Sequence, residues 1–95
     1  MLIWAIYDIQ SDRTRNKIAK LCKQVGLYRV QKSVFLGEID KNRLDELSLQ
    51  SKTIITEDDS VYIFPMCEPD FKKVILLGQA FDKELVTDEI ISKFF

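Results

Sequence analysis

The N-terminal stretch Leu2–Asp8, Leu-Ile-Trp-Ala-Ile-Tyr-Asp, is an almost unbroken apolar run that ends on a carboxylate. Its residues do not alternate between apolar and polar, which predicts a strand that is buried on both faces. A polar cluster, Gln10–Asp12, and a basic, helix-patterned segment over 13–25 come next. We therefore expect this strand to carry one acidic group, Asp8, to the edge of a sheet beside positive charge.

Helical periodicity follows this strand. Four apolar side chains recur at the spacing of a buried helical stripe: Ile18, Leu21, Cys22 and Val25. Ser11 or Asp12 can cap the start of this helix, and Gly26 can end it in a left-handed conformation. The opposite face carries three cations spaced three or four residues apart, here named the basic ridge: Arg13, Lys17 and Lys20.

Shorter patterns predict the remaining elements. Alternation over 28–36 predicts one bent strand, or two strands broken near Lys32. Asp40 is expected to cap a second helix from Lys41 to about Gln50. Two further strands are expected at apolar runs, one over 61–64 that Pro65 stops and one over 74–77 that Gly78 ends, after a loop over 68–70.

These elements predict an α+β fold of one domain, with helices on one face of a mainly antiparallel sheet. Residues 1–78 form the expected domain, and residues 79–95 a tail with a helix start at Thr87–Glu89 and exposed apolar pairs. The last predicted strand has a free edge that can pair with another chain. The tail would pack on its own subunit or on a partner.

Composition excludes several classes of chemistry. The chain has no histidine, which excludes histidine-based catalysis and leaves carboxylates as the main acid–base and metal-binding groups. Cys22 and Cys67 are expected to be buried thiols in a reducing compartment. No signal peptide or membrane-length apolar run is present, so we expect a cytoplasmic protein without a membrane partner.

The charge is unevenly distributed behind a net charge of −1. Residues 11–32 contain seven basic side chains and one acid, which gives +6, whereas residues 38–59 contain seven acids and three bases, which gives −4. A polyanion could bind the first region despite the acidic whole. A solvated helix face would explain the same composition.

Several motifs then point to a family. The motifs are Tyr7-Asp8-Ile9, Asp-Arg-Thr-Arg-Asn-Lys-Ile-Ala-Lys over 12–20, Gly26, Arg-Val-Gln-Lys-Ser-Val-Phe-Leu-Gly over 29–37 and Glu-Asp-Asp-Ser-Val-Tyr-Ile-Phe over 57–64. Together they resemble the CRISPR-associated "Cas two" family, the small subunit of the spacer-acquisition machinery. The resemblance extends from Met1 to about Gly78.

The resemblance implies a ferredoxin-like βαββαβ sandwich with an extra C-terminal strand, which forms a homodimer. It implies a metal-dependent endonuclease acting on RNA or double-stranded DNA, with Mg²⁺ or Mn²⁺ bound between the two Asp8 residues of the dimer. It places five further residues at the catalytic site: Tyr7, Arg15, Arg29, Ser33 and Phe35. It also implies a second role, a non-catalytic scaffold that binds duplex DNA and bridges dimers of the CRISPR integrase. Nucleic acid would then bind along the basic ridge and Arg15.

Each candidate residue has a simpler structural interpretation. Asp8 could cap a turn, Arg29 could pair with Asp8 or a surface acid, and Phe35 could be an ordinary core residue. Lys17 stands where arginine is common in the family, which puts a catalytic role there in doubt. The pair Asp58-Asp59 resembles a metal site but is more typical of a turn that enters a strand.

Overall fold

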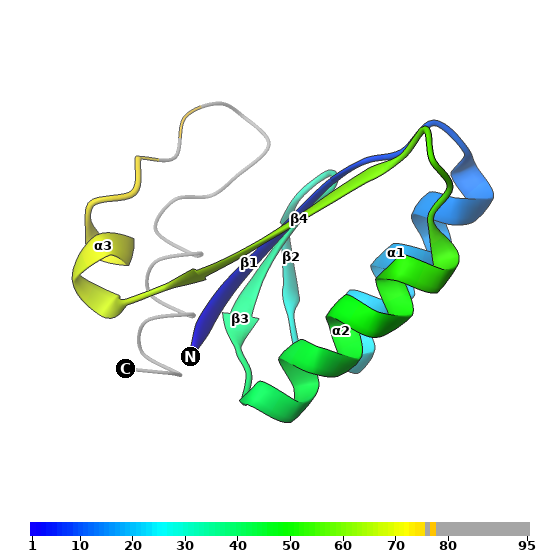
Figure 1. Ribbon diagram of the computed structural model, residues 1–95. Coiled ribbons are helices and arrows are strands. Elements are labelled where there is room, and N and C mark those ends of the chain that lie inside the picture. The colour runs from blue at the N-terminus through cyan, green and yellow to red at the C-terminus, as the bar shows by residue number, and fades with distance from the viewer. Residues whose placement is uncertain (76, 78–95) are drawn as a thin grey trace.

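The structure is a computed structural model that describes residues 1–75 and 77. The elements of this part are β1 (Leu2–Asp8), α1 (Asp12–Gln24), β2 (Tyr28–Gln31), β3 (Val34–Glu38), α2 (Lys41–Ile54), β4 (Ser60–Met66) and α3 (Glu68–Lys72). The strands form one antiparallel sheet in the order β2-β3-β1-β4. Helices α1 and α2 lie together on one side of this sheet (Figure 1). The predicted ferredoxin-like α+β fold is confirmed.

Strand β1 is buried because it has a strand on each side and packed residues on both faces. Toward α1 and α2, Ile3, Ala5 and Tyr7 belong to the main core. On the opposite face, Leu2 and Trp4 belong to a second, smaller cluster. Residues on both faces of β1 pack against apolar side chains before the strand end, which explains why the sequence does not alternate.

The ends of α1 follow local chemistry. The Ser11 side chain accepts a hydrogen bond from the Thr14 backbone N–H at 3.3 Å, so Ser11 is the N-cap. The four residues of the predicted stripe are buried. Gly26 has φ +104° and follows the last turn, a conformation in which any other L-residue would be strained. The predicted helix and both of its boundaries are confirmed.

Between the helices, the chain forms a hairpin rather than one bent strand. Strands β2 and β3 are separated at Lys32 and Ser33, and Ser33 has φ 66°. The register between them shifts between Arg29 and Gln31, which marks a bulge. Of the two alternatives for this region, the break near Lys32 is the one observed.

Two predicted boundaries are wrong. Helix α2 continues past Gln50 to Ile54, because Ser51 is buried and Ile54 packs on the main core at helical spacing from Leu47. Strand β4 continues through Pro65, which does not stop it. β4 is an edge strand of the described sheet, where the missing N–H of a proline leaves no internal bond broken.

The chain after β4 also differs from the prediction. The expected loop over 68–70 is part of helix α3, which buries Phe71 against Trp4 with 6.2 Å between ring centroids. Val74, Ile75 and Leu77 lie in no strand of this chain, so the predicted fourth strand over 74–77 is wrong for these residues. The reason is that α3 turns the chain out of the sheet after Met66. Cys67 is therefore exposed, so the expectation of a buried thiol is wrong for Cys67 and confirmed for Cys22. Pairing of the 74–77 segment with another chain stays a prediction.

The predicted tail over 79–95, with its helix start at Thr87, lies outside the described residues. Within residues 1–75 and 77, no helix has the length and apolar character needed to cross a bilayer. Helices α1 and α2 are the two long ones, and both cover the same face of the sheet (Figure 1). Among the described residues, the opposite face is therefore the more open one.

Candidate functional site

Asp8 is the last residue of β1 and is exposed. It pairs in register with Ser60, the first residue of β4. Side chains alternate between the faces of a strand, so Asp8 projects away from α1 and α2, whereas its neighbour Tyr7 projects toward them. No hydrogen bond or ion pair to the Asp8 side chain is found in residues 1–75 and 77. Asp8 therefore neither caps the following turn nor pairs with Arg29.

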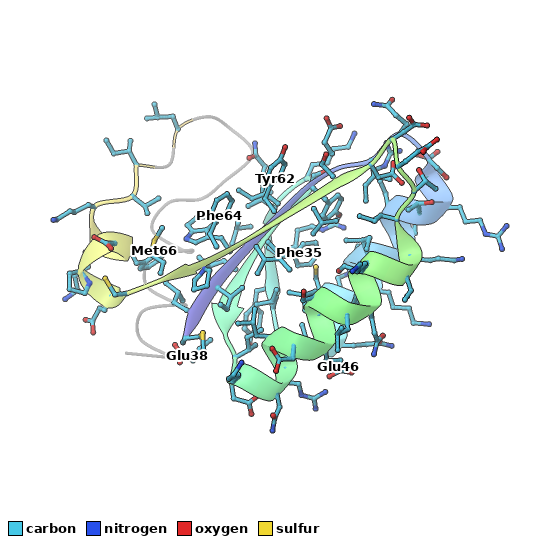
Figure 2. All side chains as sticks on the ribbon, in the orientation of Figure 1. Phe35, Glu38, Glu46, Tyr62, Phe64 and Met66 are labelled. Carbon is cyan, nitrogen blue, oxygen red and sulfur yellow. The ribbon has the colours of Figure 1, made fainter. Side chains whose placement is uncertain are left out.

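The face that carries Asp8 is largely apolar. Tyr62 and Phe64 are about half exposed on it, and their rings stack with 6.2 Å between centroids. Figure 2 shows Tyr62, Phe64 and Met66 on the side of β4 away from α2. A hollow of about 360 Å³ opens here, lined by Trp4, Ile6, Gln31, Val34, Phe64, Met66 and Val74. Asp8 thus lies at the end of an open, apolar sheet face.

A second feature, named the polar pocket here, lies on the other face at the same end of β1. It encloses about 290 Å³ and is lined by Tyr7, Asp12, Arg15, Asn16, Arg29, Lys32 and Ser33. Three different parts of the fold supply these residues: the end of β1, the first turns of α1 and the β2–β3 hairpin. The polar pocket exists because the hairpin turn folds over the start of α1.

Tyr7, Phe35 and Arg29 form one stack beside the polar pocket. The Tyr7 and Phe35 rings are 6.3 Å apart at an interplanar angle of 26°. The Arg29 guanidinium lies 5.1 Å from the centroid of the Phe35 ring, within the range of a cation–π contact. Phe35 is fully buried and Arg29 is exposed, so the aromatic ring is a platform that orients the cation.

The Tyr7 phenol remains protonated at neutral pH. Burial raises the pKa of Tyr7 above its usual value, and the nearby Arg29 guanidinium opposes that shift. A hydrogen bond with the Ser33 side chain and the charge of Arg15 also act to lower this pKa. The net direction is upward, so the hydroxyl is a hydrogen-bond donor rather than a base.

Arg15 and Ser33 are held in place by the backbone. Arg15 donates hydrogen bonds to the carbonyl oxygens of Ile9 at 3.2 Å and Gln10 at 3.4 Å, and it forms an ion pair with Asp12. The Ser33 carbonyl accepts a hydrogen bond from the Tyr7 N–H at 3.1 Å. These bonds tie the hairpin turn and the start of α1 to the end of β1.

The structure therefore divides the predicted catalytic residues into two groups. Tyr7, Arg15, Arg29 and Ser33 meet at the polar pocket, while Asp8 lies on the opposite face of the sheet. Phe35 lines neither, because it is fully buried beneath Arg29 and Tyr7, as its interpretation as a core residue requires. Figure 2 shows Phe35 on the side of the sheet toward α2.

Sequence reasoning missed two residues of the polar pocket, Asn16 and Lys32, as site residues. Both flank residues that were predicted, Arg15 and Ser33. Their neighbours in sequence therefore indicated the region, whereas the fold was needed to bring α1 and the hairpin together.

The remaining candidates lie on the surface or in a turn. The three cations of the basic ridge are exposed on α1. Asp59 accepts hydrogen bonds from the backbone N–H and the hydroxyl of Thr56 at 2.9 and 3.0 Å, so the acidic pair belongs to a turn that enters β4. Within residues 1–75 and 77, no three Cys, Asp or Glu side chains gather as metal ligands.

The fold, Asp8 and the polar pocket together define a ferredoxin-like α+β domain with a solvent-facing carboxylate at the end of its central strand. The family model "CRISPR associated protein Cas2" matches residues 1–74. The chain belongs to the CRISPR-associated Cas2 family.

Curated relatives and solved structures agree with this assignment. The chain is 31% identical over 78 residues to the CRISPR-associated endoribonuclease Cas2 of Korarchaeum cryptofilum, covering 81% of this chain and 84% of the relative. It is 39% identical over 69 residues to an endoribonuclease Cas2 of Archaeoglobus fulgidus, covering 72% and 73%. The crystal structure of Streptococcus pyogenes Cas2 superposes with a TM-score of 0.71 at 26% identity, covering 82% of this chain and 100% of that one.

Proposed function

We propose that this CRISPR-associated protein is an endonuclease of spacer acquisition that hydrolyses RNA or double-stranded DNA at a site containing Asp8. Support comes from the similarity to relatives named endoribonucleases. The observation that carries the proposal is the exposed Asp8 carboxylate at the end of an open apolar face, without a partner in the described residues.

The number of metal ligands that one chain supplies at Asp8 suggests a site shared by two copies of the chain. A hard divalent cation takes several oxygen ligands, and no group of three metal-ligating side chains forms at Asp8 within the described part of the chain. In a symmetric dimer formed through the open face, the second Asp8 supplies the missing ligand. This fits Mg²⁺ or Mn²⁺ held between two Asp8 side chains, with water and phosphate oxygens completing the shell.

The chain and the ion divide the chemistry between them. A bound Mg²⁺ would polarise a phosphate oxygen and lower the pKa of a coordinated water. The protein fixes the carboxylates at the end of a rigid, buried strand. The basic ridge attracts the substrate but lies on the other side of the sheet, so it contributes affinity rather than chemistry.

The test is cleavage of RNA and duplex DNA by the purified protein with Mg²⁺, with Mn²⁺ and with EDTA. Asp8→Asn should reduce the rate about a hundredfold or more, because a neutral amide is a poor ligand for a hard cation. Asp58→Asn is the matched control, since Asp58 is an exposed carboxylate in the turn before β4. Cleavage by Asp8→Asn at the rate of the control would reject the proposal.

A non-catalytic scaffold is the second candidate, favoured by the three exposed cations of the basic ridge. In this role the dimer binds duplex DNA through phosphate contacts and docks the CRISPR integrase through residues 79–95. Replacing the basic ridge with glutamine should flatten the salt dependence of duplex binding by a log–log slope of about 2 to 3. An unchanged slope, or integrase binding that survives deletion of Thr87–Phe95, would reject it.

A further inference from the structure

The polar pocket carries more positive charge than its own acid neutralises. Its lining includes the cations Arg15, Arg29 and Lys32, and Asp12 is its acid. Arg15 is already paired with Asp12. No ion pair involves Arg29 or Lys32 within residues 1–75 and 77. Two uncompensated positive charges therefore face a concave site.

Neutral donors surround these charges. The Tyr7 hydroxyl and the Ser33 hydroxyl both line the polar pocket, and the Asn16 amide lies beside them. Arginine over an aromatic ring is restricted in orientation, and the Phe35 platform fixes Arg29 in this way.

The backbone conformation of Ser33 also supports a binding site here. Its φ of 66° is a conformation that glycine adopts without strain and serine does not. Glycine would satisfy the turn but would remove one hydroxyl from the polar pocket. The serine thus adds a hydrogen-bonding group where the turn alone requires none.

We propose that the polar pocket binds a phosphate monoester, such as the phosphorylated end of a nucleic acid strand, on the face of the sheet opposite Asp8. A monoester carries a charge of about −1.5 to −2 at neutral pH, which the two uncompensated cations match. A phosphodiester carries only one negative charge. This inference rests on the proposed function for the class of ligand, a nucleic acid, but not for any step at Asp8.

The dimensions agree with a strand end. A pocket of about 290 Å³ admits a phosphate group and the sugar next to it. The hairpin turn forms one wall of it and the start of α1 another. Arg15, fixed by the carbonyls of Ile9 and Gln10, forms a preorganised wall.

Fluorescence anisotropy in EDTA tests this proposal without any cleavage. The probes are one short oligonucleotide with a 5′-phosphate, with a 3′-phosphate and with hydroxyl ends, and inorganic phosphate serves as the competitor. A phosphorylated end should bind about tenfold tighter than the hydroxyl-ended strand, and inorganic phosphate should remove that preference. Equal affinity for all three strands would overturn the proposal.

Variants separate the polar pocket from general basic charge. Arg29→Ala and Lys32→Ala should each remove most of the roughly tenfold preference for a phosphorylated end. Arg43→Ala and Lys52→Ala are the matched controls, because both residues are exposed on α2 and should leave the preference unchanged. Equal losses in all four variants would overturn the proposal and identify nonspecific attraction.

Folding and the proposed nuclease are controlled separately. Lys32 is exposed in a hairpin turn, so Lys32→Ala decides the question if Arg29→Ala fails to fold. If the protein shows no Asp8-dependent cleavage but prefers a phosphorylated end, only the proposed nuclease is rejected. Absence of any end preference with Asp8-dependent cleavage intact would reject the polar pocket alone.

Discussion

The contact between Arg29 and Phe35 can be measured as a coupling free energy. A double-mutant cycle would combine Phe35→Leu with Arg29→Gln, a change that keeps the arginine stem but removes the cation. The guanidinium lies 5.1 Å from the ring centroid, and Arg29 is exposed. Cation–π contacts at exposed sites contribute about 0.5–1 kcal/mol, so the coupling should fall in that range.

The single Phe35→Leu change should cost more than this coupling. It removes the Tyr7 stack, worth about 0.5–1.5 kcal/mol, and the Arg29 contact, and the shape change in a fully buried position adds about 1 kcal/mol. The total is about 2–3.5 kcal/mol, which a small domain with about 5–15 kcal/mol of stability survives.

Urea denaturation followed by circular dichroism measures all four corners of the cycle. Leu47→Ala provides the control cycle with Arg29→Gln, because Leu47 is fully buried on α2 and belongs to the same core. That pair should be additive within about 0.3–0.5 kcal/mol. A coupling of zero between Phe35 and Arg29, or one equal to the control, would refute the platform role of Phe35.

Two further stability measurements test the fold around the site. Ser33→Gly should change the free energy of unfolding by less than about 1 kcal/mol, because relief of the φ 66° strain, about 1–2 kcal/mol, is offset by the entropy cost of glycine, about 0.5–1 kcal/mol, and by loss of the Ser33–Tyr7 hydrogen bond, about 1 kcal/mol. A loss of more than about 2 kcal/mol in urea denaturation would contradict this. Burial raises the pKa of the Cys22 thiol to about 12, whereas the thiol of an unfolded chain ionises near pH 8.5. The unfolded state therefore loses its proton first, and the free energy of unfolding falls as pH rises above about 9. Cys22→Ala should weaken that decline in stability between pH 8 and 10.5, whereas Cys67→Ala, at an exposed position, should not. Identical pH slopes in the two variants would contradict the role of Cys22 in the decline.

The sequence predicts most of the fold because its signals are local. The apolar run before Asp8, the Ser11 cap and Gly26 each act within a few residues, and each lies where it was expected. Prediction failed where tertiary packing decides. Phe71 is buried against Trp4, 67 residues earlier in the chain, and that contact supports a helix where only a loop was expected.

The candidate site was predicted as a set of residues but not as an arrangement. Tyr7 and Asp8 are adjacent in sequence, yet strand alternation sends them to opposite faces of the sheet. The polar pocket joins α1 to the hairpin turn through a left-handed residue, Ser33, that no pattern in the sequence marks. Asn16 lies on α1 and Lys32 in the hairpin turn, so both line one pocket only because that turn folds over the start of α1.

The central claim, that hydrolysis at Asp8 requires two copies of the chain, is tested most directly by mixing subunits. Wild-type protein and Asp8→Asn would be unfolded together, refolded and assayed for cleavage with Mg²⁺ at a fixed total concentration. If each site needs both Asp8 side chains, activity follows the square of the wild-type fraction, and an equal mixture retains about one quarter. Retention of about one half, expected for an independent site in each subunit, or of about three quarters, expected for a shared site that needs one Asp8, would contradict the account.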